Sequence, residues 1–205
     1  MRIDPGTDIL GIVDAQPTFM PGGELAVAGG YEIIPVINRL LSRFAHAFAT
    51  QDWHPPGHAS FASSHPGKAP FDSYNGDTLW PDHAIAGSPN AAIHAAIDQT
   101  RIELIVRKGF RPQLDSYSAF FENDRKTHTG LDGWLRQRGF KHVFIAGLAT
   151  DYCVGWSAED ALRLGYAVTI VEDACRGIAQ ATIDAMRARL TALGCQFIAS
   201  TDLVG

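Results

Sequence analysis

Cysteine is scarce in this sequence, with three in 205 residues, and there is neither a lysine or arginine cluster nor a long hydrophobic run. An odd number of cysteines does not suit a disulfide framework, and their spacing fits no zinc ribbon, so we expect reduced thiols. No apolar stretch is long enough to cross a bilayer, which argues against a membrane partner. A net charge of −5 without a basic patch argues against a nucleic-acid partner.

The sequence pattern also predicts neither a targeting segment nor a linker. Asp4 and Pro5 come before the first apolar run, so we expect no signal peptide. Glycine and proline are scattered, and there is no internal repeat or low-complexity segment. These features predict one cytoplasmic domain over residues 1–205 that acts on a small-molecule substrate, either alone or as a homo-oligomer.

Short apolar runs alternate with segments of helical periodicity along the chain. Strands are predicted at residues 9–14, 45–50, 102–106, 142–146, 167–171 and 196–199. Helices are predicted at residues 31–43, 129–137, 153–164 and 179–193. Because the strands are continuously apolar, both faces of the sheet are expected to be covered. The pattern predicts an α/β fold, a three-layer α/β/α sandwich with a six-stranded mostly parallel sheet.

Cys153 is the most informative residue, because it follows a predicted strand and begins a predicted helix. Thr150 or Asp151 is a suitable N-cap for that helix. Free backbone N–H groups and the helix dipole at such a position favour a thiolate, which is a strong nucleophile. A single cysteine is nevertheless more often a small buried hydrophobe, and we interpret Cys175 and Cys195 in that way.

Two charged residues follow other predicted strands, and open parallel sheets gather their active sites at the carboxyl ends of strands. Asp14 ends the first strand and Lys108 follows the third. Taken singly, each is more often a turn cap or a solvated side chain. Taken together with Cys153, they supply a nucleophile, a base and a charge stabiliser.

A candidate metal site lies in the first of two long irregular segments, residues 51–89 and 109–128, and loops of that length are usually functional. Asp52 and His54 are two residues apart on an extended segment and therefore point the same way. His83 completes a set of one oxygen and two nitrogens that suits Zn²⁺ or Fe²⁺, with Mn²⁺ as an alternative, and His58 is a candidate fourth ligand. The alternative is that histidines of a proline-rich surface loop contact only water.

The sequence resembles the bacterial nicotinamidases (pyrazinamidases), which are isochorismatase-like cysteine hydrolases. Its blocks follow the family's order from about residue 8 to residue 193: DAQ at 14–16, FMPGG at 19–23, QDWHP at 51–55, WPDH at 80–83, KG at 108–109, DSYSAFF at 115–121, GLATDYCV at 147–154 and DACRG at 173–177. Two departures stand out. Pro17 and Thr18 replace a common Asn-Asp pair, and Ala84 and Ile85 replace Cys-Val.

The resemblance implies an isochorismatase-like hydrolase fold and roles for individual residues. The implied catalytic triad is Cys153, Asp14 and Lys108, and the implied metal ligands are Asp52, His54 and His83. Substrate-binding positions are implied at Phe19, Trp80, Leu148 and Tyr152, with a cis peptide bond between Leu148 and Ala149. The backbone N–H groups of Ala149 and Cys153 are expected to form the oxyanion hole.

The predicted reaction is hydrolysis of nicotinamide to nicotinate and ammonia through a thioester. One divalent metal is predicted as cofactor, with zinc preferred over iron or manganese. Such a reaction belongs to NAD salvage. Two alternatives stay open. One is another cysteine amidase of the superfamily, acting on carbamoyl or ureido substrates, although those relatives typically lack the full metal set. The other is a non-catalytic binding module with the same fold.

Overall fold

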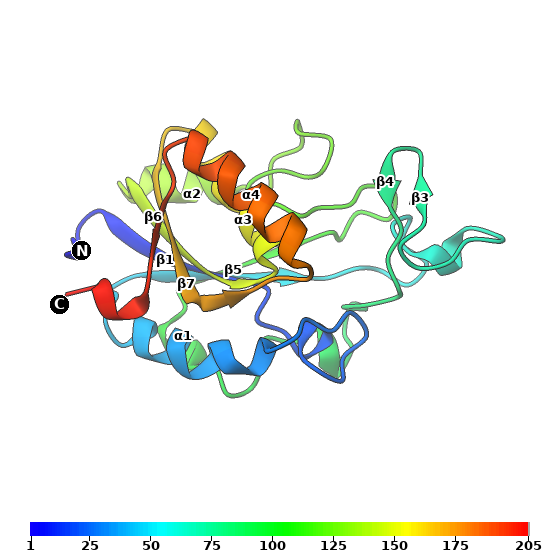
Figure 1. The fold of residues 1–205 in the computed structure, drawn as a ribbon, viewed down its shortest axis with the longest axis horizontal. Helices are drawn as coiled ribbons and strands as arrows, with labels where there is room; N and C mark the ends of the chain where they lie inside the picture. Colours follow the sequence, from blue (N-terminus) through cyan, green and yellow to red (C-terminus); the bar gives the residue numbers. More distant parts are fainter. Residues whose placement is uncertain (205) are drawn as a thin grey trace.

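A six-stranded sheet runs through the middle of the molecule, with helices on both faces (Figure 1). This computed structural model describes residues 1–204. From one edge to the other, the strands are β5 (Leu104–Lys108), β2 (Ala47–Asp52), β1 (Asp8–Val13), β6 (His142–Leu148), β7 (Ala167–Arg176) and β8 (Gln196–Ile198). All neighbouring strands of this sheet pair in parallel. The predicted three-layer fold is confirmed.

Residues of β1 alternate between two hydrophobic cores, as the two-residue period of a strand requires. Leu10 and Ile12 belong to the core beneath α1 (Ile33–Leu41), whereas Ile9 and Val13 belong to the core on the opposite face. That second face is covered by α2 (Leu131–Gln137), α3 (Gly155–Arg163) and α4 (Gln180–Ala192) (Figure 1). Within residues 1–204, no helix has the length and apolarity needed to cross a membrane.

The strand order places a topological switch point between β1 and β6. The chain leaves β1 to form β2 and β5 on one side, and the later strands β6, β7 and β8 extend the sheet on the other side. In open α/β sheets, ligands bind outside the carboxyl ends of the strands at such a point. Asp14 directly follows β1, and Cys153 lies shortly after β6.

The irregular segment of residues 51–89 contains a small hairpin that was not predicted from the sequence. It consists of β3 (Ser73–Tyr74) and β4 (Asp77–Thr78), which pair in an antiparallel manner. Asn75 and Gly76 connect the two strands, and both have positive φ, as a tight hairpin turn requires. With two residues per strand, this hairpin is too short to show a recognisable period in the sequence.

The turn that carries Cys153 differs from the predicted helix start. Thr150–Val154 forms a π-helical turn, and α3 begins only at Gly155. The expected cap at Thr150 or Asp151 is wrong, because neither the turn nor α3 has a side-chain cap. Asp151 instead accepts hydrogen bonds from backbone N–H groups at the start of α4.

Candidate active site

Lys108 is the centre of a buried cluster at the carboxyl ends of four neighbouring strands. Its Nζ lies 2.8 Å from Oδ2 of Asp14, 2.7 Å from Oδ1 of Asp52 and 3.4 Å from Sγ of Cys153. The backbone oxygen of Ser116 accepts a further hydrogen bond from Nζ at 3.1 Å. The four partners come from loops or strands far apart in the sequence, and the parallel sheet brings them together.

Burial and mutual charge set the protonation of this cluster. Burial acts to lower the pKa of Lys108, but the carboxylates of Asp14 and Asp52 outweigh it and raise that pKa well above the ordinary value. Burial raises the pKa of Asp14, and Lys108 opposes this effect. Because Lys108 stays charged between two carboxylates, the ion cluster retains its partners despite lying in the protein interior.

Burial also raises the pKa of the Cys153 thiol well above its ordinary value; Lys108 acts to lower this pKa, and the carboxylates of Asp14 and Asp52 act to raise it. The expectation that the helix N-terminus favours a thiolate is therefore wrong in direction. A neutral thiol next to a carboxylate of increased proton affinity is suited to proton transfer from sulfur to Asp14.

Asp52, His54 and His83 form a second group beside this cluster. Oδ2 of Asp52 lies 3.2 Å from Nε2 of His54 and 3.3 Å from Nε2 of His83. Nδ1 of His54 donates to the Gly109 oxygen and Nδ1 of His83 donates to the Pro81 oxygen, each at 2.8 Å. In both imidazoles Nδ1 is thus held by a backbone oxygen and Nε2 points toward the same carboxylate, the orientation found in histidine metal ligands.

This donor set fits a divalent metal, because one atom from each of the three residues lies within 4.8 Å of the others. Gly109 allows the His54 ring to lie against the backbone. The φ of Gly109 is +65°, and a Cβ added to Gly109 would lie 2.4 Å from Cε1 of His54. The three side chains are buried. Zinc and iron both accept one carboxylate and two imidazoles with open positions.

His58 is held away from this group by its own hydrogen bonds. Its Nδ1 lies 2.7 Å from Oγ of Ser60, and its Nε2 lies 2.8 Å from the Arg111 oxygen. The ring instead packs on His54, with the ring centroids 4.4 Å apart. Both ring nitrogens of His58 already have protein partners, so nothing in this geometry adds it to the Asp52 group.

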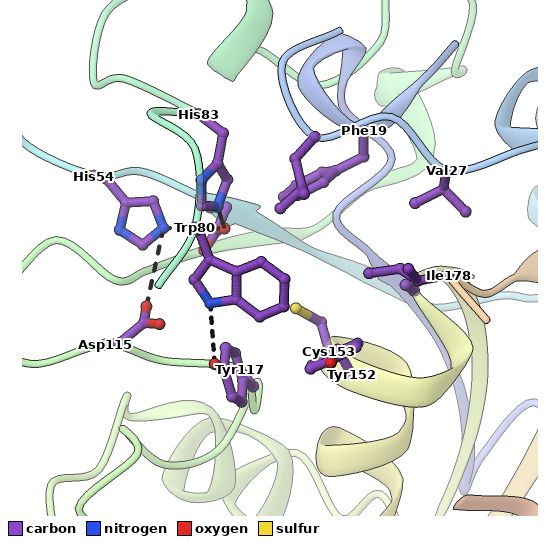
Figure 2. A pocket seen from close by; sticks show the side chains of 13 residues that line it. Phe19, Val27, His54, Trp80, His83, Asp115, Tyr117, Tyr152, Cys153 and Ile178 are labelled. Carbon is purple, nitrogen blue, oxygen red and sulfur yellow. Dashed lines mark hydrogen bonds and ion pairs between the residues drawn. The ribbon is translucent and has the colours of Figure 1, made fainter. Parts of the chain in front are cut away.

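Both groups reach one pocket, which is lined by Cys153 of the first group and by Asp52, His54 and His83 of the second (Figure 2). The predicted pocket residues in its lining are Phe19, Trp80, Ala149, Tyr152 and Cys153. Leu148 is 1% exposed and lies in the hydrophobic core instead. The peptide bond between Leu148 and Ala149 is cis, as expected.

The pocket also contains residues to which the sequence analysis gave no role: Leu25, Val27, Asp115, Tyr117 and Ile178. Trp80 donates its indole N–H to the Tyr117 hydroxyl at 3.0 Å, which fixes the orientation of both rings. Oδ1 of Asp115 lies 4.0 Å from Nε2 of His54 (Figure 2). The DSYSAFF block pointed to Asp115 and Tyr117, whereas no sequence pattern marked the three aliphatic residues.

Comparisons with known proteins agree with this fold and site. The family model described as "Isochorismatase domain" matches residues 8–202. A nicotinamidase of Acinetobacter baylyi is 50% identical over 171 residues, which cover 82% of this chain and 80% of that protein. A solved nicotinamidase/pyrazinamidase of Acinetobacter baumanii superposes with a TM-score of 0.95 at 44% identity, covering 98% of this chain and 99% of that one.

A solved pyrazinamidase of Pyrococcus horikoshii in complex with zinc is similar as well. Its TM-score is 0.79 at 32% identity, and the match covers 94% of this chain and 98% of that chain. The family model and these relatives extend over most of the described structure, including both groups of the pocket. The chain therefore belongs to the isochorismatase family.

Proposed function

We propose that this protein is a nicotinamidase, which hydrolyses nicotinamide to nicotinate and ammonia. The observation that carries the proposal is the joint presence of two groups in one pocket. The cluster of Cys153, Lys108 and Asp14 supplies acyl-transfer chemistry, and the group of Asp52, His54 and His83 lies beside it. The names of the similar proteins from the two Acinetobacter species support the same substrate.

The reaction begins with proton transfer from the Cys153 thiol to the Asp14 carboxylate. The thiolate then attacks the amide carbon, which forms a C–S bond and converts the carbonyl oxygen to an oxyanion. The N–H groups of Ala149 and Cys153 donate to this oxyanion. Lys108 holds the Asp14 carboxylate at 2.8 Å and stabilises the negative charge that forms on sulfur.

Asp14 next returns its proton to the amide nitrogen, the C–N bond breaks, and ammonia leaves a thioester on Cys153. Asp14 then accepts a proton from a water molecule, which attacks the thioester carbon and releases nicotinate. The returning proton restores the thiol.

Asp52, His54 and His83 would hold a divalent metal, with zinc preferred over iron or manganese, and the metal would supply a Lewis acid for a ring nitrogen. The zinc complex of the similar Pyrococcus horikoshii pyrazinamidase supports the choice of metal. Phe19 contributes to the pocket beside this group, and its ring packs edge-on against His83 with centroids 5.6 Å apart. The group of Asp52, His54 and His83 thus orients the pyridine ring of the substrate while Cys153 reacts with the amide of the substrate.

Ammonia release from nicotinamide tests the proposal directly. We expect turnover by the purified protein, loss of turnover after metal removal by a chelator, and recovery when Zn²⁺, Fe²⁺ or Mn²⁺ is added back. Ammonia release from a ureido or carbamoyl substrate, without release from nicotinamide, would establish the metal-independent amidase instead. Absence of turnover together with an alkylation-resistant Cys153 would favour a binding module.

The same proposal extends to the organisation and location of the protein. The three cysteines are free and buried in the described structure, which suits a reducing compartment such as the cytoplasm. The six strands share one sheet with a hydrophobic core on each face, as a single domain requires.

A further inference from the structure

The pocket has a polar wall and an apolar wall. The polar wall consists of Asp52, His54, His83 and Asp115, and the apolar wall consists of Leu25, Val27 and Ile178. Figure 2 shows Val27 and Ile178 on the other side of Cys153 from His54 and His83. Val27 is 1% exposed, whereas Ile178 is 41% exposed, so Ile178 forms the rim of the apolar wall.

The backbone beside Ile178 is fixed by the carboxylate of Asp151. Oδ1 of Asp151 accepts a hydrogen bond from the Ile178 N–H at 3.0 Å, and Oδ2 accepts one from the Ala179 N–H at 3.2 Å. The Thr182 hydroxyl donates to the same Oδ2 at 2.5 Å. Asp151 is buried, so these charge-assisted hydrogen bonds are shielded from water.

The segment between β7 and α4 contains Gly177 and Ile178. At Gly177 it passes so close to Asp151 that there is no room for a side chain. A Cβ added to Gly177 would lie 2.9 Å from Oδ1 of Asp151 and 2.5 Å from Cγ1 of Ile183. Asp151 is also part of the turn Thr150–Val154, two residues before Cys153. One carboxylate therefore ties the rim of the pocket to the turn that presents the nucleophile.

We propose that Ile178 determines which ring substituents the enzyme accepts, and that Asp151 is its positioning residue. This inference rests on the proposed function. With the amide carbon at Sγ of Cys153 and the ring nitrogen toward the polar wall, ring positions 4 and 5 of nicotinamide face the apolar wall. The side chains of this wall offer no hydrogen-bonding group.

The chemistry of the apolar wall defines the substrate class. Hydrogen or a small alkyl group at position 5 meets only aliphatic carbon, whereas a charged group there loses its hydration without gaining a partner. The enzyme therefore accepts uncharged nicotinamides with small apolar substituents at position 5 and rejects 5-carboxynicotinamide. A longer alkyl chain collides with Ile178 at the rim.

The test compares kcat/KM for 5-propylnicotinamide with kcat/KM for nicotinamide in the metal-loaded protein. We expect Ile178→Ala to raise this ratio at least about tenfold, which is the discrimination that a few methylene groups provide in an apolar pocket. The ratio for 6-methylnicotinamide should stay as in the parent protein, because position 6 adjoins the ring nitrogen and faces the polar wall.

Ile105→Ala is the matched control variant. Ile105 is 45% exposed on the edge strand β5 and lies outside the pocket lining, so its removal should leave both ratios unchanged. If Ile178→Ala still hydrolyses nicotinamide but its ratio of kcat/KM for 5-propylnicotinamide to kcat/KM for nicotinamide is unchanged, the inference about Ile178 is overturned and the proposed function stands. Failure of the parent protein to hydrolyse nicotinamide would instead overturn the proposed function.

A double variant tests the role of Asp151. Asp151→Asn removes the negative charge that accepts the hydrogen bonds, so we expect it to raise the 5-propyl ratio in the parent protein. In the Ile178→Ala background the same change should leave the ratio unaltered, because the side chain that Asp151 positions is gone. An equal rise in both backgrounds, or none in the parent, would refute the positioning role. If Asp151→Asn does not fold, Asp151→Glu replaces it in both backgrounds.

Discussion

Asp52 shares its two carboxylate oxygens between Lys108 and the histidines. Oδ1 lies 2.7 Å from Nζ of Lys108, while Oδ2 faces Nε2 of His54 at 3.2 Å. Burial acts to raise the pKa of Asp52, but Lys108 and His54 outweigh it and hold that pKa well below its ordinary value. The cluster around Lys108 and the pair of histidines are therefore joined through the side chain of Asp52. Substitutions in the cluster are expected to differ in effect from substitutions of the histidines.

Replacement of His54 should remove the metal without disturbing the thiol. We expect about one divalent metal per chain in the parent protein and little in His54→Ala, because one of three ligands is lost. Substrate binding should weaken strongly, while Cys153 should still react with iodoacetamide at the parental rate. Metal analysis and alkylation followed by mass spectrometry measure the two effects. A metal-free parent protein that binds none of Zn²⁺, Fe²⁺ or Mn²⁺ would contradict this prediction.

Replacement of Asp52 should change both groups. The negative charge of Asp52 contributes to the raised pKa of Cys153, so Asp52→Asn should lower that pKa and speed alkylation at a given pH. The same variant should lose the metal. Alkylation rates between pH 6 and 10, compared with those of His54→Ala, separate the two consequences. Equal pH profiles in both variants would show that Asp52 has no electrostatic effect on the thiol.

Cys153→Ala should abolish amide hydrolysis while the protein remains folded, because no other group on the pocket wall can form the thioester. Cys175→Ala is the matched control: Cys175 is also buried but does not line the pocket, so its variant should retain activity. Ammonia release and circular dichroism measure the two properties. Turnover by Cys153→Ala near the parental rate would exclude the thioester mechanism.

Asp14→Asn preserves the shape of the side chain but removes the proton acceptor. We expect kcat to fall at least about 10²-fold, the usual cost of removing a general base. Lys108→Ala should raise the apparent pKa of the Cys153 thiol, since the ammonium is the neighbour that lowers it. Alkylation rates against pH measure this shift. An unchanged profile in Lys108→Ala would remove Lys108 from the reaction.

The protein should lose stability in acid because of His142, which lies outside the pocket lining. Burial lowers the pKa of His142, so below the ordinary value of 6.5 the unfolded chain binds a proton more readily than the folded protein. The free energy of unfolding should therefore fall as pH decreases through this range, and less steeply in His142→Gln. Urea unfolding at pH 7.5 and pH 5.5 measures both slopes. Identical slopes would show that another group causes the acid sensitivity.

The strands and the cluster at their ends could be predicted because the relevant signals are local. Apolar runs indicated the strands; Asp14 and Cys153 each follow a strand, and Lys108 is the last residue of β5. Ile178 could not be predicted, since its place in the pocket depends on hydrogen bonds to Asp151, 27 residues earlier in the chain. The protonation of Cys153 was mispredicted for a similar reason: the helix start is local, whereas burial and two distant carboxylates decide the pKa.

The complete burial of Lys108 has a thermodynamic consequence for the protein as a whole. A charged cluster inside a core costs desolvation energy that its own ion pairs recover only in part, and well-packed apolar replacements of buried ion pairs often stabilise a fold by about 1–4 kcal/mol. At the carboxyl ends of these strands, reactivity is therefore kept at the expense of folding stability. Variants selected for heat resistance alone should drift toward aliphatic side chains at these positions and become inert.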